Sequence, residues 1–188
     1  MAGDVDTASD SDLVASALDG SEHAYRMLMA RHREAVYRLA RAHVGDESEA
    51  LDVTQECFIA AFGALGRFEH GRSFRAWLLR IALNKCRDWA RRRAVRRFLV
   101  FARPIEDAIH IADKAPDPEM ALQASVEVKR IERALQTLPL KLRDPLILCT
   151  VEGMSQDEAA ALLKVSRKTI ETRIYRARQK LSALLETA

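Results

Sequence analysis

The residues that point most directly to a chemistry are cations near the end of the chain. Lysine and arginine crowd a short segment there, and the only acid among them is Glu171. The cations are Arg167, Lys168, Arg173, Arg176, Arg178 and Lys180. Clustered positive charge on a folded helix is the electrostatic footprint of binding to a phosphate backbone. The segment therefore indicates recognition of nucleic acid.

Two short helices joined by a tight turn are predicted to position these cations. Ser155 and Glu158 have the spacing of a capping box that begins the first helix. Residues 164–166 make the turn, and Ser166 caps the second helix, whose apolar residues recur at helical spacing. They are Ile170, Ile174, Ala177 and Leu181. The pattern is typical of a helix-turn-helix; a solvated basic helix in an ordinary bundle is the alternative.

A second basic segment lies in the middle of the chain. Residues 72–103 contain eleven arginines and lysines against the single acid Asp88, whereas residues 4–22 contain six acids and no base. The net charge of the whole chain is only +3. It is therefore the segregation of charge, and not its total, that suggests a nucleic-acid partner.

Helical signals dominate the sequence, so the predicted fold class is all-α, with two small helical domains joined by a flexible linker. Four helices are predicted in the first domain: Ser11 to Gly20, Ser21 to Gly45, about Glu47 to Ala64, and a long basic helix from the cap Ser73. Met29 belongs to the apolar spacing of the second helix. The third helix is expected to bury Leu51, Phe58, Ile59 and Phe62.

The helical pattern lapses from Phe98 to Pro118, where prolines and acids return. This predicts domains at residues 1–97 and 119–188 with a linker at 98–118. The second domain should contain a helix over 119–137, a break at Leu138-Pro139, a helix at about 141–152 and the helix-turn-helix. The apolar run 98–101 fits either a helix end packed on the core or a docking site for a partner.

Composition and motifs exclude several classes of protein. With 48% hydrophobic and 30% charged residues the chain is expected to be a soluble, cytoplasmic protein without direct membrane insertion. Cys57, Cys86 and Cys149 are too far apart for a metal motif, so we expect reduced thiols. The histidines lack ligand spacing, and no carboxylate pair, nucleophile elbow or phosphate loop is present. We therefore expect no enzyme activity, no cofactor and no metal.

Four blocks, in order, resemble the extracytoplasmic-function (ECF) group of bacterial RNA polymerase sigma factors, in its sigma-E-like branch. The first is Asp52-Val-Thr-Gln-Glu-Cys-Phe58, and the second is Phe68 followed by the run from Ser73 to Asn84. The third joins Leu138-Pro139 and Arg143 to Glu152-Gly-Met-Ser155, and the fourth runs from Arg173 to Arg178. The resemblance covers nearly the whole chain and implies a promoter-specificity subunit.

The resemblance also implies roles for individual residues. Asp52, Gln55 and Glu56 share one helix face, which would bind core RNA polymerase; the polymerase contacts would involve its β′ and β subunits. The −10 promoter element would be bound by Phe68, Arg72, Ser73, Arg75, Asn84, Arg87 and Arg91. The −35 element would be bound by Arg167, Lys168, Glu171, Thr172, Arg173, Arg176 and Arg178. An anti-sigma factor is a further expected partner.

Some positions depart from the family pattern or allow a second interpretation. Lys164 and Lys168 stand where glycine is frequent, and Glu171 stands where a base is frequent. Glu171 would repel phosphate but could accept a hydrogen bond from cytosine, so the preferred −35 sequence stays open. Trp77 is expected to be a core residue rather than a base contact. A free-standing helix-turn-helix regulator is the alternative function.

Overall fold

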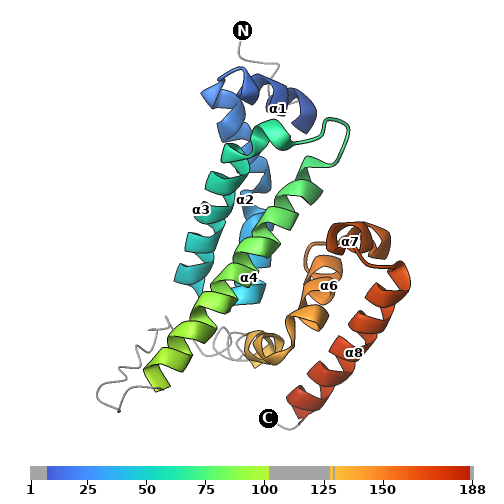
Figure 1. Ribbon diagram of the computed structural model, residues 1–188. Helices are drawn as coiled ribbons and strands as arrows, with labels where there is room; N and C mark the ends of the chain where they lie inside the picture. Colours follow the sequence, from blue (N-terminus) through green and yellow to red (C-terminus); the bar gives the residue numbers. More distant parts are fainter. Residues whose placement is uncertain (1–7, 102–127, 129, 187–188) are drawn as a thin grey trace, which may run out of the picture.

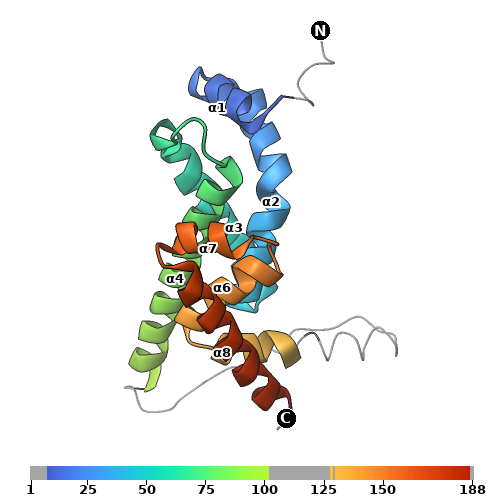
Figure 2. The same cartoon turned by 90° about the vertical axis from the view of Figure 1, so that its right-hand side faces the viewer.

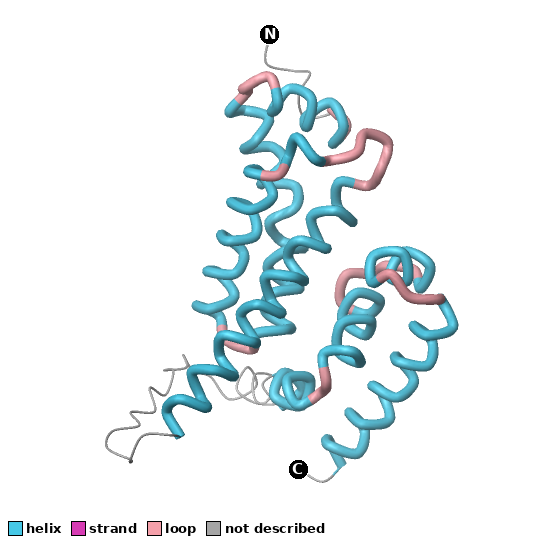
Figure 3. The backbone as a smooth tube through the Cα atoms, in the orientation of Figure 1, coloured by secondary structure: helices cyan, strands magenta, loops and turns pink. Residues whose placement is uncertain are grey.

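The computed structural model describes residues 8–101, 128 and 130–186, and every regular element within them is a helix. The prediction of an all-α fold is therefore confirmed. The described residues form two helical units, an N-terminal unit of residues 8–101 and a C-terminal unit of residues 130–186, shown in Figures 1 and 3. No helix within these ranges is long and apolar enough to cross a membrane.

The N-terminal unit is a bundle of four helices. They are α1 (Asp10–Leu18), α2 (Glu22–Val44), α3 (Glu47–Gly63) and α4 (Phe74–Phe101), with a 3-10 turn, η1 (Leu65–Arg67), after α3. Helix α2 packs against each of the other three. Its buried face carries Leu28, Val36 and Leu39, which repeat at helical spacing, so an amphipathic pattern in the sequence becomes the centre of the bundle.

Several predicted helix ends are confirmed. The Ser21 hydroxyl accepts from the backbone N–H of Ala24 at the start of α2. Gly45 ends that helix with a φ of 78°, a left-handed conformation that glycine adopts without the cost of a Cβ. Ser73 caps α4 through the N–H of Ala76. Caps satisfy backbone groups that have no partner within the helix, which is why these serines and this glycine were readable from sequence.

The predicted start of the first helix was wrong. Ser9 caps α1, not Ser11: the Ser9 hydroxyl accepts from the N–H of Asp12, and the Asp12 carboxylate accepts from the N–H of Ser9. This is a complete capping box. In the sequence Ser-Asp-Ser-Asp, two serines each precede acids. The structure selects Ser9, which buries Leu13, Val14 and Ala17 against the bundle.

Two of the burial predictions for α3 were also wrong. Leu51 and Ile59 are exposed, Ile59 to 74%. The core is instead contacted by smaller residues of α3: Ala50, Val53, Cys57 and Ala61. Phe58 is buried as expected and Phe62 partly so. Met29 on α2, an apolar position of the predicted pattern, is exposed as well.

The C-terminal unit contains helical residues 130–137 followed by three further helices. They are α6 (Leu140–Thr150), α7 (Gln156–Leu163) and α8 (Arg167–Glu186). The predicted break at Leu138-Pro139 is confirmed, and α6 continues through Pro145. Ser155 and Glu158 form the predicted capping box of α7, and Ser166 caps α8 through the N–H of Thr169.

The turn between α7 and α8 passes through Lys164, which has a φ of 54°. An L-residue in this left-handed region costs roughly 1 kcal/mol relative to glycine. This cost explains why glycine is frequent at this position in the sigma-factor group that the sequence resembles. Lys164 fits the turn at some cost in stability.

Helix α4 extends further than predicted. Its backbone is helical to Phe101, so the predicted lapse of helix from Phe98 was wrong for its first four residues. Residues 102–127, which hold the rest of the predicted linker and the start of the second domain, lie outside the described residues. The proposed roles of the side chains in the run 98–101 also fall outside what the structure describes.

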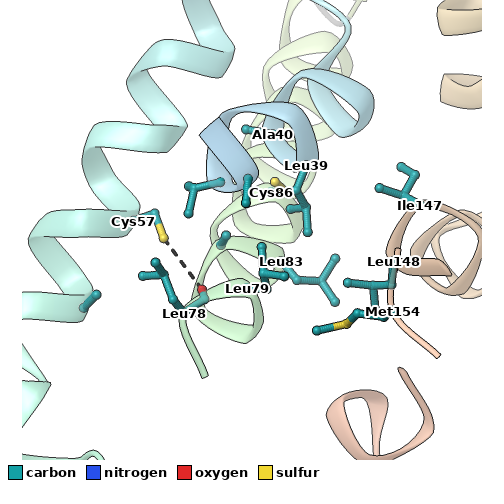
Figure 4. Packing of buried hydrophobic residues seen from close by; sticks show 14 of the residues in the cluster. Leu39, Ala40, Cys57, Leu78, Leu79, Leu83, Cys86, Ile147, Leu148 and Met154 are labelled. Atoms are coloured by element: carbon teal, nitrogen blue, oxygen red, sulfur yellow. Dashed lines mark hydrogen bonds between the residues drawn. The ribbon is translucent and has the colours of Figure 1, made fainter. Parts of the chain in front are cut away.

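The two units pack against each other through α2 with α6 and through α4 with α7. In Figures 1 and 2 the C-terminal unit lies along one side of α4. Figure 4 shows Leu79 and Leu83 of α4 beside Leu148 and Met154 of the C-terminal unit. All four side chains are buried, and they belong to one continuous hydrophobic cluster. The interface between the units therefore has an apolar centre.

The two serines near the start of α1 give a direct test of the revised helix boundary. Replacing Ser9 with alanine removes the cap and should lower the free energy of unfolding by about 1 kcal/mol. Replacing Ser11, which is exposed inside the helix, should leave it nearly unchanged. Urea denaturation followed by circular dichroism measures both; a larger loss for Ser11→Ala would contradict the assigned cap.

Candidate polymerase-binding and nucleic-acid surfaces

The polar face predicted on α3 is present. Asp52 and Gln55 are exposed, and neither side chain has a hydrogen bond or ion pair with another described residue. Glu56 is half-buried, and its carboxylate lies 3.3 Å from Arg92 and 3.7 Å from Lys85, both on α4. The three predicted residues thus share one side of α3, but the charge of Glu56 is partly neutralised. Asp52 and Gln55 are the groups available to a partner.

An apolar groove adjoins this face, and sequence reasoning missed it. Met29 of α2 and Phe58, Ile59 and Phe62 of α3 line a groove of about 300 Å³, with Gln55 at its edge. Met29 and Ile59 project into solvent. Exposed apolar side chains beside polar ones are typical of a protein-binding surface. The large apolar residues of this groove were visible in the sequence. Their helical spacing alone, however, does not tell whether each of them is buried or exposed.

Phe68, predicted to contact the −10 element, is a buried ring. It is 5% exposed and packs edge to face with Phe74 and Trp77, each at 5.5 Å between ring centroids. Phe74 is buried too, whereas Trp77 is half-buried. The ring of Phe68 therefore supports the loop that precedes α4. With so little of the ring exposed, Phe68 adds only a small part of the lining of the neighbouring pocket.

Trp77 forms the apolar side of a pocket of about 270 Å³ that lies between the two units. Cations surround it on the α4 side, at Arg67, Arg72 and Arg80, and Leu162 of α7 closes the other side. Aromatic and apolar walls with nearby cations are suited to an unstacked base and its backbone. Arg72 itself is exposed and pairs with Glu69 at 2.7 Å. Ser73 is occupied as the cap of α4.

The remaining predicted −10 residues follow one another along α4. Asn84 is exposed, and its Oδ1 accepts a long hydrogen bond of 3.5 Å from Arg87. Arg91 is exposed and pairs with Asp88 one turn back. Arg75 and Arg87, however, are each joined to a carboxylate of the C-terminal unit: Arg75 to Glu152 at 2.8 Å and Arg87 to Asp144 at 2.6 Å.

Asp144 is the centre of a buried polar cluster. Its second carboxylate oxygen accepts from Nε2 of His43 at 3.0 Å, and Arg143 donates to the backbone oxygen of His43 at 3.1 Å. Burial lowers the pKa of His43 to about 3, and the charges of Arg143 and Arg87 add to the effect. The imidazole is therefore neutral. Burial also raises the pKa of Asp144, although its hydrogen bonds to Arg87 oppose the change.

The predicted −35 residues gather on α8, away from the N-terminal unit. Figure 1 shows α6 between α8 and α4. Arg176 and Arg178 are exposed, and Thr172 and Arg173 are half-buried. Glu171 lies 3.1 Å from Lys168 and 3.5 Å from Arg167, and the hydrogen bond from Lys168 is the first cause that lowers the pKa of Glu171. Glu171 thus reduces the positive charge at the start of the helix.

The described residues offer no site for a metal ion built from three or more His, Cys, Asp or Glu side chains. Cys57 and Cys86 are buried free thiols and Cys149 is half-buried. Burial raises the pKa of Cys57 to about 12 and raises that of Cys86 as well. Buried thiols held in the protonated form are poor nucleophiles, which fits structural roles.

Comparison with known proteins identifies the class. Residues 28–96 match the family Sigma-70 region 2, and residues 129–181 match the family Sigma-70, region 4. The first match covers α3 and most of α2 and α4, and the second covers α6, α7 and most of α8. The two units therefore correspond to regions 2 and 4 of a sigma factor of the sigma-70 family.

Curated relatives narrow the class further. The chain is 42% identical to the RNA polymerase sigma factor NccH of Alcaligenes xylosoxydans xylosoxydans over 97% of this chain and 98% of that one. It is 44% identical to CnrH of Cupriavidus metallidurans over 95% of each. It is 30% identical to the ECF sigma-E factor of Escherichia coli over 91% of each. The protein belongs to the ECF group of RNA polymerase sigma factors, which are transcription initiation factors and not enzymes.

Two solved structures share the fold. CnrH in complex with the cytosolic domain of CnrY aligns with a TM-score of 0.71 and 38% identity, over 95% of this chain and 97% of that one. The sigma factor RpoE of Bartonella quintana, in complex with the anti-sigma factor NepR, aligns with a TM-score of 0.66 and 26% identity, over 86% and 96%. Both are complexes of a sigma factor with a second protein.

The burial of Phe68 leads to a prediction about stability. Phe68→Ala should lower the free energy of unfolding by about 3 kcal/mol, because it leaves a cavity beside Phe74 and Trp77. The exposed neighbour Arg72 is the matched control, and Arg72→Ala should change stability by less than about 0.5 kcal/mol. Urea denaturation of both variants measures the difference. A Phe68→Ala protein as stable as the wild type would show that the ring is not part of the core.

Proposed function

We propose that this sigma factor binds core polymerase through the exposed part of α3, the −10 strand through α4 and the −35 duplex through α8. The observation that carries the proposal is that one chain presents two basic helices in separate units, one of them the second helix of a helix-turn-helix. Each unit reads few bases by itself. Promoter selection then requires both units to be positioned by the polymerase.

The polymerase contact is assigned to Asp52, Gln55 and the half-neutralised Glu56, together with the neighbouring apolar groove. Polar and charged groups at such a contact set register and the rate of association more than raw affinity. The exposed Met29 and Ile59 supply apolar area that buries on binding. This combination of an acidic rim with an apolar groove fits a protein partner better than it fits DNA.

On α4, Asn84 is the residue assigned to a base. An exposed amide can donate to and accept from a base edge, and the surrounding cations hold the backbone. The cations assigned to the −10 strand are Arg72, Arg75, Arg87 and Arg91. Phe68 is buried and Ser73 caps α4. We therefore assign Phe68 and Ser73 to shaping the loop around the pocket beside Trp77.

On α8, the residues Arg167, Lys168, Glu171 and Thr172 lie at the N-terminal end of the recognition helix, the part that enters a major groove. Arg173, Arg176 and Arg178 lie further along, where phosphate contacts position the helix. The pairing of Glu171 with Lys168 and Arg167 orients all three side chains. Glu171 is suited to accept from cytosine N4, with the two cations lowering its repulsion of phosphate.

A protein inhibitor is the remaining proposed partner. The CnrH and RpoE structures are complexes with CnrY and with the anti-sigma factor NepR. An anti-sigma factor that covers the α3 face and groove would prevent access to polymerase, which acts in the cytoplasm. The exposed apolar residues there would be buried by either partner, so the two would compete.

The α3 face gives the first functional prediction. Replacing Asp52 and Glu56 together with alanine should weaken association with core polymerase about tenfold while leaving the helical content unchanged, because neither side chain belongs to the core. The matched control replaces Glu22 and Glu186, which are exposed acids on other helices. A fluorescence titration with core polymerase measures the affinities. Equal affinities for both double variants would reject this face.

The second functional prediction separates a sigma factor that needs polymerase from an autonomous regulator. Free protein should bind promoter duplex weakly, with little preference over scrambled DNA and with a steep loss of affinity as salt rises. Adding core polymerase should create sequence preference, since it fixes the spacing of the two units and removes the entropy cost of positioning them. Gel-shift titrations at near-physiological salt measure both states. Tight, sequence-specific binding by free protein would favour the regulator.

A further inference from the structure

The contact between the two units is built around two carboxylates of the C-terminal unit. The Glu152 side chain is fully buried and accepts from Arg75 at 2.8 Å and from Arg38 at 3.3 Å. Asp144 is almost fully buried and accepts two hydrogen bonds from Arg87, at 2.6 and 3.0 Å. Carboxylates in such positions form charge-assisted bonds that are stronger than those between neutral groups.

Two of these guanidinium groups belong to the surface assigned above to DNA. Arg75 and Arg87 lie on α4 with Asn84, and in this conformation each donates to a carboxylate rather than to a phosphate. We propose that Asp144, Glu152 and their partners form an autoinhibitory latch, in which two carboxylates of the C-terminal unit take the place of DNA phosphates on α4. The proposal rests on the proposed function of α4.

The latch also covers α4 sterically. Helix α7 closes the pocket beside Trp77 through Glu158, Ala161 and Leu162. A second cavity of about 450 Å³ has Arg80, Asn84 and Arg87 on one side and residues 162–164 on the other. A DNA strand that followed α4 would have to displace α7. In the closed form, two of the cations assigned to the −10 strand are paired with carboxylates, and α7 lies against the pocket beside Trp77.

Closing the units has a cost, because the carboxylates and guanidinium groups of the inter-unit ion pairs lose hydration when they are buried. This cost offsets part of the gain from the apolar centre at Leu83 and Met154. A partner that binds the separated units can therefore shift the equilibrium.

The masking is one-sided. Helix α8 packs on α6 and α7, and its exposed cations Arg176 and Arg178 remain accessible in the closed form. The latch thus withholds the strand-binding surface of α4 while the duplex-binding helix stays available. Opening is needed for the −10 strand in particular.

The test uses the full-length chain and substitutions that keep side-chain size. Glu152→Gln removes the charge that holds Arg75 and Arg38. Arg38→Gln weakens the contact with Glu152 from the other partner, and Arg38 is not assigned to DNA. If both variants behave alike, the effect is not a folding defect specific to position 152. Glu22→Gln is the matched control, since Glu22 is an exposed acid whose recorded ion pair is within its own helix. Circular dichroism checks that each variant is folded.

Two measurements report on the latch. Small-angle X-ray scattering should show a larger radius of gyration for Glu152→Gln and Arg38→Gln than for the wild type and the control. Fluorescence anisotropy with a random single-stranded oligonucleotide of about twelve nucleotides should show about tenfold tighter binding by Glu152→Gln, because a larger fraction of molecules is open. The double variant Arg75→Gln/Glu152→Gln should stay expanded and lose most of that gain.

An unchanged radius of gyration in both opening variants overturns the proposal, and so does expansion without tighter binding. Retention of the full gain by the double variant would show that Arg75 is not the masked group and would overturn it as well. The scattering result is independent of DNA. Failure of the proposed function of α4 would appear separately, as normal promoter-specific transcription by the Arg75→Gln single variant with core polymerase.

Discussion

The arrangement of this molecule depends on how two buried carboxylates are compensated. Asp144 and Glu152 lie where the two units meet, and the ion pairs of both cross from one unit to the other. Arg87 and Arg75 come from α4 and Arg38 comes from α2, across sequence separations of 57 to 114 residues. An uncompensated buried charge is far more costly than a paired one. Packing of the units and pairing of these charges are therefore one event: if the units separate, both carboxylates must be hydrated.

This constraint explains why a chain with two basic helices can pack its two units against each other. Two basic surfaces repel each other, and α4 is densely positive. Two buried acids of the C-terminal unit, Asp144 and Glu152, lie on the side that meets α4, whereas the exposed cations Arg176 and Arg178 lie on α8. The charge is thus arranged so that the units attract through one face of the C-terminal unit and present positive charge on another. Long-range attraction of this kind steers association and weakens as salt rises.

Local features of the fold were predictable from sequence because they depend on neighbouring residues. Ser21, Ser73 and the pair Ser155 and Glu158 act as caps in the structure as predicted, since a cap involves only the first turn of its helix. The failures have physical reasons too. Ser9 has the acid Asp12 three residues on, whereas Ser11 has Val14 there, so the capping box that forms was a local signal in the sequence that the prediction overlooked. The family of the protein was also predictable, because its motifs combine residue types with spacing.

Other features of the site could not have been read from the sequence, because they depend on contacts between distant segments. Glu152 belongs to the third block of the family resemblance, and Asp144 directly follows Arg143 of that block. Nothing in the neighbouring sequence indicates that these two carboxylates pair with Arg75 and Arg87. Ile59 and Met29 fit a buried pattern, and only the absence of a covering helix among the described residues shows that they face solvent. The burial of Phe68 could not be read from its own neighbours either, because the rings that cover it belong to the start of α4.

The one-sided closure suggests an order of events in promoter recognition. Duplex DNA has its phosphates in place before melting, so under the proposed function α8 would engage it while α4 is still masked. The −10 strand becomes available only when the duplex opens, and under the same proposal the arginines of α4 would be needed at that step. A latch made of carboxylates is suited to this order, because phosphates compete for the same guanidinium groups and the polymerase, by holding the units apart, makes that competition favourable. Strand binding on α4 would then be coupled to assembly with polymerase and not to the affinity of the free protein for DNA.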